Sequence, residues 1–468
     1  MKITPVKGTN DYLPAQAELR NYLQKKICET YEQAGFQRIA TPIIEDIENL
    51  DKSEGGDNLN LIFKIMKRGE KLKKAIASQN PDNIADMGLR YDLTLPLSRY
   101  YANNRASLPH PFKVIQMDRV YRAERPQKGR LREFIQCDID ILGSDSATCE
   151  IELIHTTAKA LLNIGINNFK VKINDRRILR EILLSVGFEE EQLDSVCISF
   201  DKLNKIKAEG VEAELIEKGF DKDVIAEFMK LLANAPFTLD YVKEICKDNE
   251  YVASLAHIID TANALADGKY AAEYDMTLVR GQGYYTGTVF EVESLDFNSS
   301  IAGGGRYDNL IGKFLKEQIP AVGFSIGFER IYSILMEKEA YKTEKQKKVV
   351  LIYEEDQIAD AIRYAENLRK TYKTALYIKP KKLGKFLNKL EEQGFDGFQV
   401  FGRDEEVVRA AVEKHHPDTI LCVGQAGGRS GMTVEKIAVN LMEARIPDND
   451  GNQPIDQPVK KDGKNAYF

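Results

Sequence analysis

The sequence predicts an α+β fold, in which an antiparallel sheet with helices is followed by a smaller α/β domain. Two apolar, β-prone runs, residues 113–122 and 132–142, are joined by AERPQKGRL, which indicates a long antiparallel hairpin. Residues 174–270 are almost purely helical in pattern and indicate an inserted helical module. After the charged segment 337–348, short strands alternate with helices, which is typical of a small α/β domain.

Bulk properties predict a soluble protein of several domains. The chain has 468 residues, 43% hydrophobic and 29% charged, so we expect two or three domains. Its start, MKITPVKGTNDYLPAQ, lacks the apolar core of a secretory signal, and no apolar run is long enough to span a membrane. We therefore expect a cytoplasmic protein without a membrane partner.

Cysteine, histidine and charge patterns exclude several site classes. The six cysteines form no CxxC pair and the five histidines do not cluster, so we expect reduced thiols and no structural metal. The net charge of −6 argues against a general polyanion binder. Any contact with nucleic acid must come from local basic patches.

The N-terminal region predicts a helix, an edge strand and a strand-to-helix unit. Residues 16–34 carry apolar side chains at helical spacing. Residues 38–44 form a short extended piece that contains Pro42, which suits an edge or interface strand. Residues 52–86 are polar and are expected to be irregular, and MGLRYDLTLPLSRYYAN predicts a strand that runs into a helix.

The remaining elements follow from the same periodicities. We expect a helix at 149–164, a strand at 169–173, strands within 274–294 and a strand–turn–helix at 321–336. After the linker, the expected strands and helices alternate, with strands at 349–353, 374–378, 397–401 and 418–423 and helices at 356–370, 382–393 and 404–414. The predicted domains are 1–336, a linker at 337–348, an α/β domain at 349–443, and a disordered polar tail at 444–468.

The second strand of the hairpin carries a polar face. Side chains alternate along a strand, so Arg132, Phe134, Gln136, Asp138 and Asp140 share one face. Guanidinium groups bind phosphates and an aromatic ring can stack on a purine, so this face suits a polar ligand that lies along the sheet. A solvated amphipathic hairpin is the alternative.

Three further segments carry arginine, glycine or tyrosine where a ligand could approach. LVRGQGYYTG places Arg280 beside two glycines and two tyrosines, although a turn with two core tyrosines would look similar. IAGGGRYDNL has a glycine run that permits close backbone approach, or a simple tight turn. In GFSIGFERI, Arg330 opens a helix against its macrodipole, which hints at an anionic ligand. Arg122, Arg280 and Arg330 together suit a nucleoside triphosphate held on an antiparallel sheet, because no Walker A or dinucleotide glycine motif is present.

These segments resemble the class II aminoacyl-tRNA synthetases, and specifically the histidyl-tRNA synthetases. GFQRIATPIIED, YRAERPQKGRLREFIQCDID and GFSIGFERI look like motifs 1, 2 and 3 of that class. RGQGYYTG and AGGGRYDNL look like the two histidine-specific signatures, and KGTNDYLP and RYDLT also match. The resemblance covers roughly residues 5–336 in the family's order and spacing.

The resemblance implies a fold and an activity. It implies a class II antiparallel catalytic core over 1–336, with the helical insertion at about 174–270 and an anticodon-binding-type α/β domain after the linker. It implies a histidine–tRNA ligase of protein biosynthesis that uses ATP with Mg²⁺ and acts on L-histidine and tRNA(His). It also implies a homodimer, since motif 1 builds a dimer interface in this family.

The resemblance also implies site residues. Arg122 and Arg280 would be catalytic, as cations at the α-phosphate. The histidine-binding residues would be Asp92, Leu93, Thr94, Arg122, Gln136, Asp140, Arg280, Tyr284, Tyr285 and Tyr307. The ATP-binding residues would be Arg122, Glu124, Arg132, Phe134 and Arg330.

The chain departs from the family pattern in three places. Gln282 and Gly283 stand where the first signature usually has Leu-Asp, and Asn10 replaces an expected Arg. The C-terminal likeness extends through KPKKLGKFLNKLEEQGF and fades beyond Arg403. The lysines of that stretch, whose expected partner is either tRNA phosphate or solvent, are Lys379, Lys381, Lys382, Lys385 and Lys389.

A non-enzymatic alternative comes from the same superfamily. The regulatory subunit of the short-form ATP phosphoribosyltransferase is a paralogue that binds histidine without ligating it. It typically lacks the arginine of the first signature and the C-terminal domain, whereas Arg280 and an α/β region after the linker are present here.

Overall fold

The computed structural model divides the chain into two compact units, Met1–Tyr341 and Lys342–Phe468. The structure describes residues 1–51, 61–126, 130–200, 202–233, 238–246, 249–278, 284–297, 299–338, 347–400, 438–439 and 466–467. The boundary between the units falls inside the segment 337–348 that the sequence analysis assigns to a linker.

The first unit is built on an eight-stranded, mostly antiparallel sheet, so the predicted α+β fold is confirmed. The strand order is β1-β5-β6-β11-β10-β9-β7-β8, and only the outermost pairs, β1 with β5 and β7 with β8, are parallel. The strands are β1 (Gln37–Arg38), β5 (Phe112–Tyr121), β6 (Glu133–Leu142), β7 (Phe169–Asp175), β8 (Ala271–Tyr274), β9 (Thr288–Ser294), β10 (Ser299–Arg306) and β11 (Ala321–Gly327).

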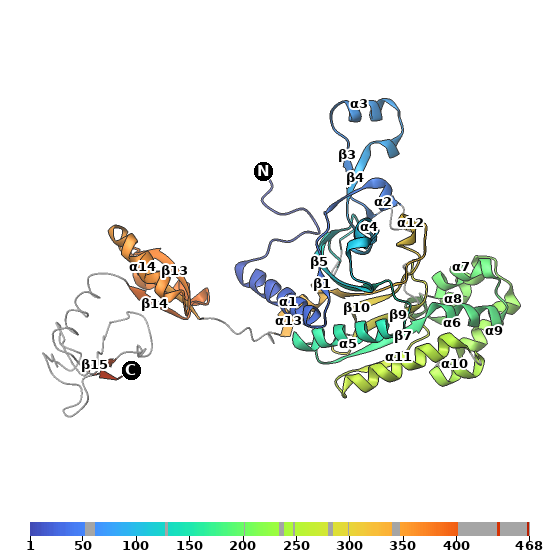
Figure 1. Cartoon of the computed structure of the whole chain (residues 1–468). Helices are drawn as coiled ribbons and strands as arrows, with labels where there is room; N and C mark the ends of the chain where they lie inside the picture. Colours follow the sequence, from blue (N-terminus) through green and yellow to red (C-terminus); the bar gives the residue numbers. More distant parts are fainter. Residues whose placement is uncertain are drawn as a thin grey trace. The chain divides into compact units, whose positions relative to one another are not determined.

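Helices cover one face of this sheet. They are α1 (Pro14–Gln33), α5 (Thr148–Asn163), α11 (Glu250–Ala266) and α13 (Phe328–Lys338). Leu23 and Ile27 of α1 pack with Ile135, Cys137 and Ile139, which are the alternate residues of β6. Figure 1 shows α5 and α11 running along the same side of the sheet. The apolar half of the β6 alternation is therefore buried under helices, and its polar half faces the other side.

In the described part of the first unit, helices cover the opposite face at one end. There α4 (Thr94–Asn104), the 3₁₀ turn Arg105–Ser107 and α12 (Gly312–Leu315) close a second core. Leu97, Tyr101 and Phe112 are buried in that core together with Tyr307. Beyond that end, the polar residues of β6 lie on this face and line a cavity among the described residues.

A smaller antiparallel sheet, of order β2-β4-β3, extends from the first unit. Its elements are β2 (Ile44–Asp46), α2 (Ile47–Asp51), β3 (Lys64–Met66), α3 (Gly69–Ala77), the 3₁₀ turn Pro81–Asn83 and β4 (Ala85–Leu89). Figure 1 shows α3 at the tip of the arm formed by β3 and β4. The expectation of irregular chain over 52–86 is thus wrong for residues 64–86. There the backbones of β3 and β4 pair with each other although the sequence shows no apolar pattern.

One other local prediction needs correction, and one pair of alternatives left open by the sequence is resolved. The single strand expected over 38–44 is two strands, β1 and β2, which belong to different sheets. The turn between them lets the Arg90 guanidinium, whose side chain is 1% exposed, donate to the Thr41 carbonyl at 2.9 Å. The glycine run 303–305 is not a tight turn, because it lies inside β10 and pairs with both β9 and β11.

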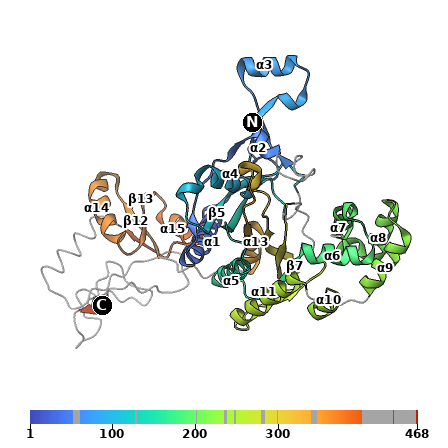
Figure 2. The ribbon, with the colours of Figure 1, turned by 45° about the vertical axis from the view of Figure 1, so that its right-hand side comes forward.

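A group of helices lies between β7 and α11, within the segment 174–270 that was predicted to be a helical insertion. Its elements are α6 (Arg176–Val186), the 3₁₀ turn Glu190–Gln192, α7 (Leu193–Phe200), α8 (Leu203–Glu217), α9 (Lys222–Ala233) and α10 (Leu239–Ile245). They form a cluster that stands beside the sheet in both views (Figures 1 and 2). Asp175 caps α6 by accepting from the Arg177 amide at 2.9 Å, and Gly187 ends it in the left-handed conformation. The chain leaves the cluster close to where it enters, because the guanidinium of Arg177 at the start of α6 lies 4.0 Å over the ring of Tyr251 at the start of α11.

The second unit contains a parallel three-stranded sheet of order β13-β12-β14. Its elements are β12 (Lys348–Tyr353), the 3₁₀ turn Glu355–Gln357, α14 (Ile358–Leu368), β13 (Lys373–Ile378), α15 (Leu383–Glu392) and β14 (Gly397–Val400). Two short strands, β15 (Ala438–Val439) and β16 (Ala466–Tyr467), pair with each other. β16 lies in the tail that was expected to be disordered, and the other expected elements beyond 401 lie outside the described residues. Within the described ranges, no helix is long and apolar enough to cross a membrane.

A buried ion pair fixes the end of β10 against α5. The Arg306 guanidinium donates to both carboxylate oxygens of Glu150, each at 2.7 Å, and the two residues are 4% and 2% exposed. Arg306 also donates to the Ser144 carbonyl at 3.1 Å. Tyr307, the next residue, is thereby held at the open face of the sheet.

Removing one partner of this pair should destabilise the first unit strongly. Arg306→Met leaves Glu150 buried without a counter-charge, which costs about 3–5 kcal/mol of unfolding free energy. The matched control is Lys113→Met, because the Lys113–Glu152 pair is about one third exposed and contributes about 0–1 kcal/mol. Urea unfolding would measure both, and equal losses would contradict the structural role of the buried pair.

Candidate active site

A cavity of about 650 Å³ lies over the open face of the large sheet. The sequence-predicted site residues that line it are Asp92, Thr94, Arg122, Glu124, Phe134, Gln136, Asp140, Tyr284, Tyr285, Tyr307 and Arg330. Leu93 and Arg132 do not line it, and Arg280 lies outside the described residues. The structure therefore brings together residues from five separate sequence segments, and Arg122 and Arg330 share one cavity.

The strand register explains why polar side chains gather here. Gln136, Asp138 and Asp140 of β6 are paired with Gly327, Ser325 and Gly323 of β11, so small residues stand beside each polar one. The closest fit is at Gly323, where an added Cβ would lie 1.9 Å from the Asp140 Oδ1 atom. Only glycine leaves room for the Asp140 carboxyl to lean across β11.

One end of the cavity is rich in hydrogen-bond acceptors and tyrosines. The Tyr307 hydroxyl donates to Asp140 Oδ1 at 2.6 Å, and both residues are buried. The Tyr284 ring stands edge-on to Tyr307, with centroids 6.1 Å apart, and tilts against Tyr285. Burial raises the pKa of Tyr307, and the neighbouring Asp140 raises it further, so this phenol remains a proton donor.

The turn before α4 delivers Asp92 to the same end. Asp92 Oδ1 accepts from the Leu95 amide at 3.2 Å, which fixes the carboxyl at the start of the helix. The Gln116 amide donates to the Leu93 carbonyl at 2.8 Å, so the fully buried Leu93 anchors this turn and does not face the cavity. Burial raises the pKa of Asp92, while the Leu95 amide and the nearby Arg122 oppose that rise.

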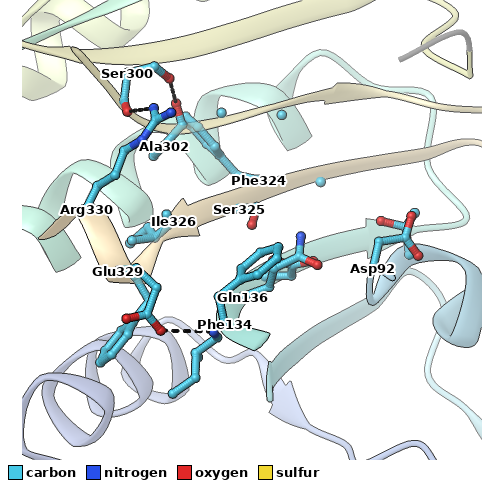
Figure 3. A pocket seen from close by; sticks show the side chains of 18 of the residues that line it. Asp92, Phe134, Gln136, Ser300, Ala302, Phe324, Ser325, Ile326, Glu329 and Arg330 are labelled. Carbon is cyan, nitrogen blue, oxygen red and sulfur yellow. Dashed lines mark hydrogen bonds between the residues drawn. The ribbon is translucent and has the colours of Figure 1, made fainter. Parts of the chain in front are cut away.

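The other end of the cavity is cationic and aromatic. The Arg122 guanidinium lies 5.0 Å from the centroid of the Phe134 ring and donates to the Tyr91 carbonyl at 3.1 Å. Arg330 donates to the Ser300 carbonyl of β10. Figure 3 shows Arg330 and Asp92 at opposite ends of the cavity, with Phe134 and Gln136 between them.

Two predicted nucleotide-side residues are engaged within the protein. Glu124 accepts from Arg130 at 3.4 Å, and the Arg132 side chain donates to the Glu124 carbonyl at 3.1 Å. Arg132 therefore holds the segment that carries Glu124, which explains why it is absent from the cavity wall. Sequence alternation placed it on the ligand face, but β6 begins only at Glu133.

Glu329 is a site residue that the sequence analysis missed. It lines the cavity, accepts from both terminal nitrogens of Arg20 at 2.6 and 2.7 Å, and accepts from the Ile135 amide at 3.3 Å. Figure 3 shows Glu329 beside Arg330 and Phe134. This carboxylate ties α1, β6 and α13 together behind the aromatic end, and no local pattern could have indicated a pairing across 309 positions.

The residues flanking the undescribed segment 279–283 are held by the junction of β7 and α6. The Asn174 amide donates to the carbonyls of Met276 at 3.1 Å and Leu278 at 3.2 Å. On the other side, the Arg176 amide donates to the Gly287 carbonyl at 3.1 Å. Both flanks of the segment that contains Arg280 are thus fixed to one junction.

The arrangement suits a ligand with two different ends. Acceptors and tyrosines receive a group with N–H donors, while guanidinium groups and Phe134 receive an anion with a planar ring. Burial raises the pKa of Asp140 to about 7 although its bond with Tyr307 lowers it. Burial and the neighbouring Asp140 also raise the pKa of Asp138 well above its ordinary value. A cation bound beside Asp138 and Asp140 would lower the pKa of both carboxyls.

Comparisons with known proteins place most of the chain in one group. A family model described as histidyl-tRNA synthetase matches residues 8–331. The chain is 42% identical to a histidine–tRNA ligase of Leifsonia xyli over 75% of this chain and 84% of that protein. It is 34% identical to a histidine–tRNA ligase of Cytophaga hutchinsonii over 85% of this chain and 92% of that protein. The crystal structure of a histidyl-tRNA synthetase from Nostoc superposes with a TM-score of 0.72, at 26% identity, over 87% of this chain and 93% of that one.

The end of the chain matches a different family. A model described as pyroglutamyl peptidase matches residues 397–468, most of which lie outside the described residues. The match begins at β14 and covers the region where the resemblance to the synthetases fades.

Asp140 should make the stability of the ligand-free protein depend on pH. Its pKa is raised to about 7 in the folded chain, against about 3.9 when unfolded. Its protonated form therefore stabilises the fold fully below about pH 4, and this contribution is lost as pH rises through about 7. Asp140→Asn removes that loss, so the difference in melting temperature between the variant and the parent should grow between about pH 5 and pH 8. Asp240→Asn, at an exposed position, is the control, and parallel curves for Asp140→Asn and the parent would contradict the prediction.

Proposed function

The chain belongs to the histidyl-tRNA synthetase family and is a histidine–tRNA ligase, and we propose that the cavity on its large sheet forms histidyl-adenylate. Histidine and ATP react there with release of pyrophosphate, and histidine then passes to the 3′ end of tRNA(His). The observation that carries this site assignment is that one cavity gathers the acidic and tyrosine residues expected for histidine with the arginines and phenylalanine expected for ATP.

The acceptor-rich end binds histidine. Asp92 receives the α-ammonium group together with Gln136, while Asp140, Tyr284 and Tyr307 surround the imidazole. The bond from Tyr307 to Asp140 supports this division, because it fixes the orientation of the carboxyl that reads the ring. A site built from buried hydrogen-bonding groups discriminates strongly against side chains that cannot pair with them.

The cationic end binds ATP. Phe134 stacks on the adenine with Arg330 on the other side, and Glu124 accepts from the adenine amino group. Arg122 holds the α-phosphate and the histidine carboxylate, and its position is supported by the carbonyl of Tyr91 and the ring of Phe134. Arg280 supplies a second cation at the α-phosphate.

The reaction follows from this placement. The histidine carboxylate attacks the α-phosphorus in line, the bond to the bridging oxygen of pyrophosphate breaks, and pyrophosphate leaves. Charge that develops on the α-phosphate oxygens is stabilised by Arg122 and Arg280, so catalysis rests on positioning and electrostatics without a protein nucleophile. The 3′-terminal ribose hydroxyl of tRNA then attacks the carbonyl carbon and releases AMP.

Mg²⁺ is expected to enter with the nucleotide, where it would neutralise phosphate charge. The described residues offer no group of three or more His, Cys, Asp or Glu side chains that could hold a metal. Glu124 and Glu329, the carboxylates nearest the ATP end, are engaged with Arg130 and Arg20.

We infer a homodimer from an exposed apolar surface. Ile44, Met66 and Met87 of the β2-β4-β3 sheet are 50%, 60% and 39% exposed. This sheet includes the end of the motif 1 segment, and exposed apolar patches of this kind mark association surfaces.

A cytoplasmic location agrees with the five free cysteines among the described residues, because such thiols persist in reducing compartments.

The non-enzymatic alternative is the histidine-binding regulatory subunit of ATP phosphoribosyltransferase. Relatives named histidine–tRNA ligase match the chain at 34% to 42% identity, which favours the ligase. Arg280 of the first signature points the same way, since the paralogue typically lacks it.

The purified protein should exchange pyrophosphate with ATP only when histidine is supplied. Tight histidine binding without exchange would favour the regulatory alternative.

Gly323→Ala should lower exchange by about a hundredfold or more, because the new Cβ would displace the Asp140 carboxyl, and misplacing a substrate-binding group by about 1 Å costs on this order. Gly384→Ala in α15 is the control, since an added Cβ there meets nothing within 4 Å, and equal exchange in both variants would contradict the proposed pocket.

The lysines at and before α15 are proposed to meet tRNA phosphates. Replacing Lys381, Lys382, Lys385 and Lys389 with Gln should leave exchange unchanged and raise the KM for tRNA in charging by about tenfold, with a weaker dependence on salt. Lys370→Gln in the same unit serves as the control. Unchanged charging in the fourfold variant would assign those lysines to solvent.

A further inference from the structure

Asp138 is a buried carboxyl in the cavity that the proposed roles leave unused. It is 5% exposed, lines the cavity, and stands on β6 between Gln136 and Asp140. Its Oδ1 atom has no hydrogen-bond partner among the described residues, and neither has Gln136 Oε1 on the same face. Buried polar atoms are nearly always paired, so two adjacent unpaired acceptors in a binding cavity indicate groups that a ligand completes.

The protein gives Asp138 little compensation for its burial. Ser325, its neighbour on β11, is a hydrogen-bonding partner, but Asp140 and Asp92 are both close enough to raise the Asp138 pKa. Arg122 is the cation that acts in the opposite direction. A carboxyl placed among like charges costs stability in the empty protein, which a cationic ligand would recover on binding.

The acceptors in this part of the cavity match the hydrogen-bond donors of an ammonium group. An ammonium group has three N–H donors and no acceptor, so it needs three acceptors in a water-free site. Asp92 and Gln136 supply two. The Thr94 hydroxyl donates to Tyr284 and keeps a neutral acceptor, whereas Gln116, which faces Asp138 across the sheet, is bonded to Leu93 and Thr41. Among the described residues of this part of the cavity, Asp138 adds a carboxylate acceptor, which binds an ammonium group more strongly than a neutral hydroxyl does.

We propose that Asp138 is the third acceptor for the α-ammonium group of the amino acid substrate, which sits over β6 between Asp92, Gln136 and Asp138. Asp138 thereby selects amino acids over analogues that lack the amino group. This proposal rests on the proposed function of the cavity. The imidazole is not its partner, because Asp140 with Tyr307 already forms a fixed pair at the tyrosine-lined end.

Three imidazole ligands separate the possible contacts. Histidine carries both the ammonium and the carboxylate, histidinol retains the ammonium alone, and imidazolepropionate retains the carboxylate alone. The histidine KM and the inhibition constants of the two analogues would be measured by pyrophosphate exchange in the full chain. Parent, Asp138→Asn and Asp140→Asn proteins would be compared, with the KM for ATP as the check for general disturbance.

Asp138→Asn should weaken histidine and histidinol by the same factor, about tenfold or more, because a charge-assisted hydrogen bond is lost. Imidazolepropionate should change by less than about twofold, since it has no ammonium to lose. Asp140→Asn is the matched control and should weaken all three ligands. If the Asn variant fails to fold, Asp138→Ser, which retains a hydroxyl for Ser325, provides the same comparison.

Two outcomes would overturn the assignment. Equal weakening of histidinol and imidazolepropionate in Asp138→Asn would show a structural role or an imidazole contact. No weakening of histidinol would show that Asp138 does not meet the ammonium. Failure of the parent protein to exchange pyrophosphate with histidine would instead reject the proposed function of the cavity, so the two failures are distinguishable.

Discussion

The strict alternation of side chains along β6 is the constraint on which the site depends. One set of residues, Ile135, Cys137 and Ile139, is sealed under α1 and α5, which fixes the register of the strand. The other set must then face the open side, whatever the cost of burying carboxyls there. The neighbouring strand β11 leaves room for these carboxyls, because Gly323 and Ser325 are the residues that pair with them. Tyr307, which follows β10, donates a hydrogen bond to the Asp140 carboxyl. The cavity is thus a product of strand pairing more than of any single loop.

Much of this architecture was accessible from residue patterns, because the decisive elements are local. The hairpin, the β11–α13 unit and the helical insertion all follow from periodicity within one segment, and the polar face of β6 follows from counting by two. Long-range features were not accessible. The bond of Arg20 with Glu329 and the division of residues 37–46 between two sheets depend on contacts that have no trace in local spacing. Glycines 303–305 were open to misreading, since a strand flanked closely on both sides uses glycine as readily as a turn does.

The C-terminal unit has a mixed relationship to known families. The synthetase model ends at residue 331, the Cytophaga relative covers 85% of the chain, and the peptidase model begins at residue 397. The lysine-bearing helix α15 precedes that last match. Of this unit, the structure describes β12 to β14, where strands and helices alternate as the sequence predicted.

The contact between Arg177 and Tyr251 has a consequence for the helical cluster α6–α10. It brings the entry and exit of the α6–α10 cluster to one spot, so β7, α11 and β8 complete their crossover regardless of what is spliced between them. The helices between these two points can therefore be exchanged or lengthened without a change in how the strands of the sheet pair. Because Asn174 and Arg176 at the same spot also hold the flanks of the Arg280 segment, a change in that module also acts on those flanks.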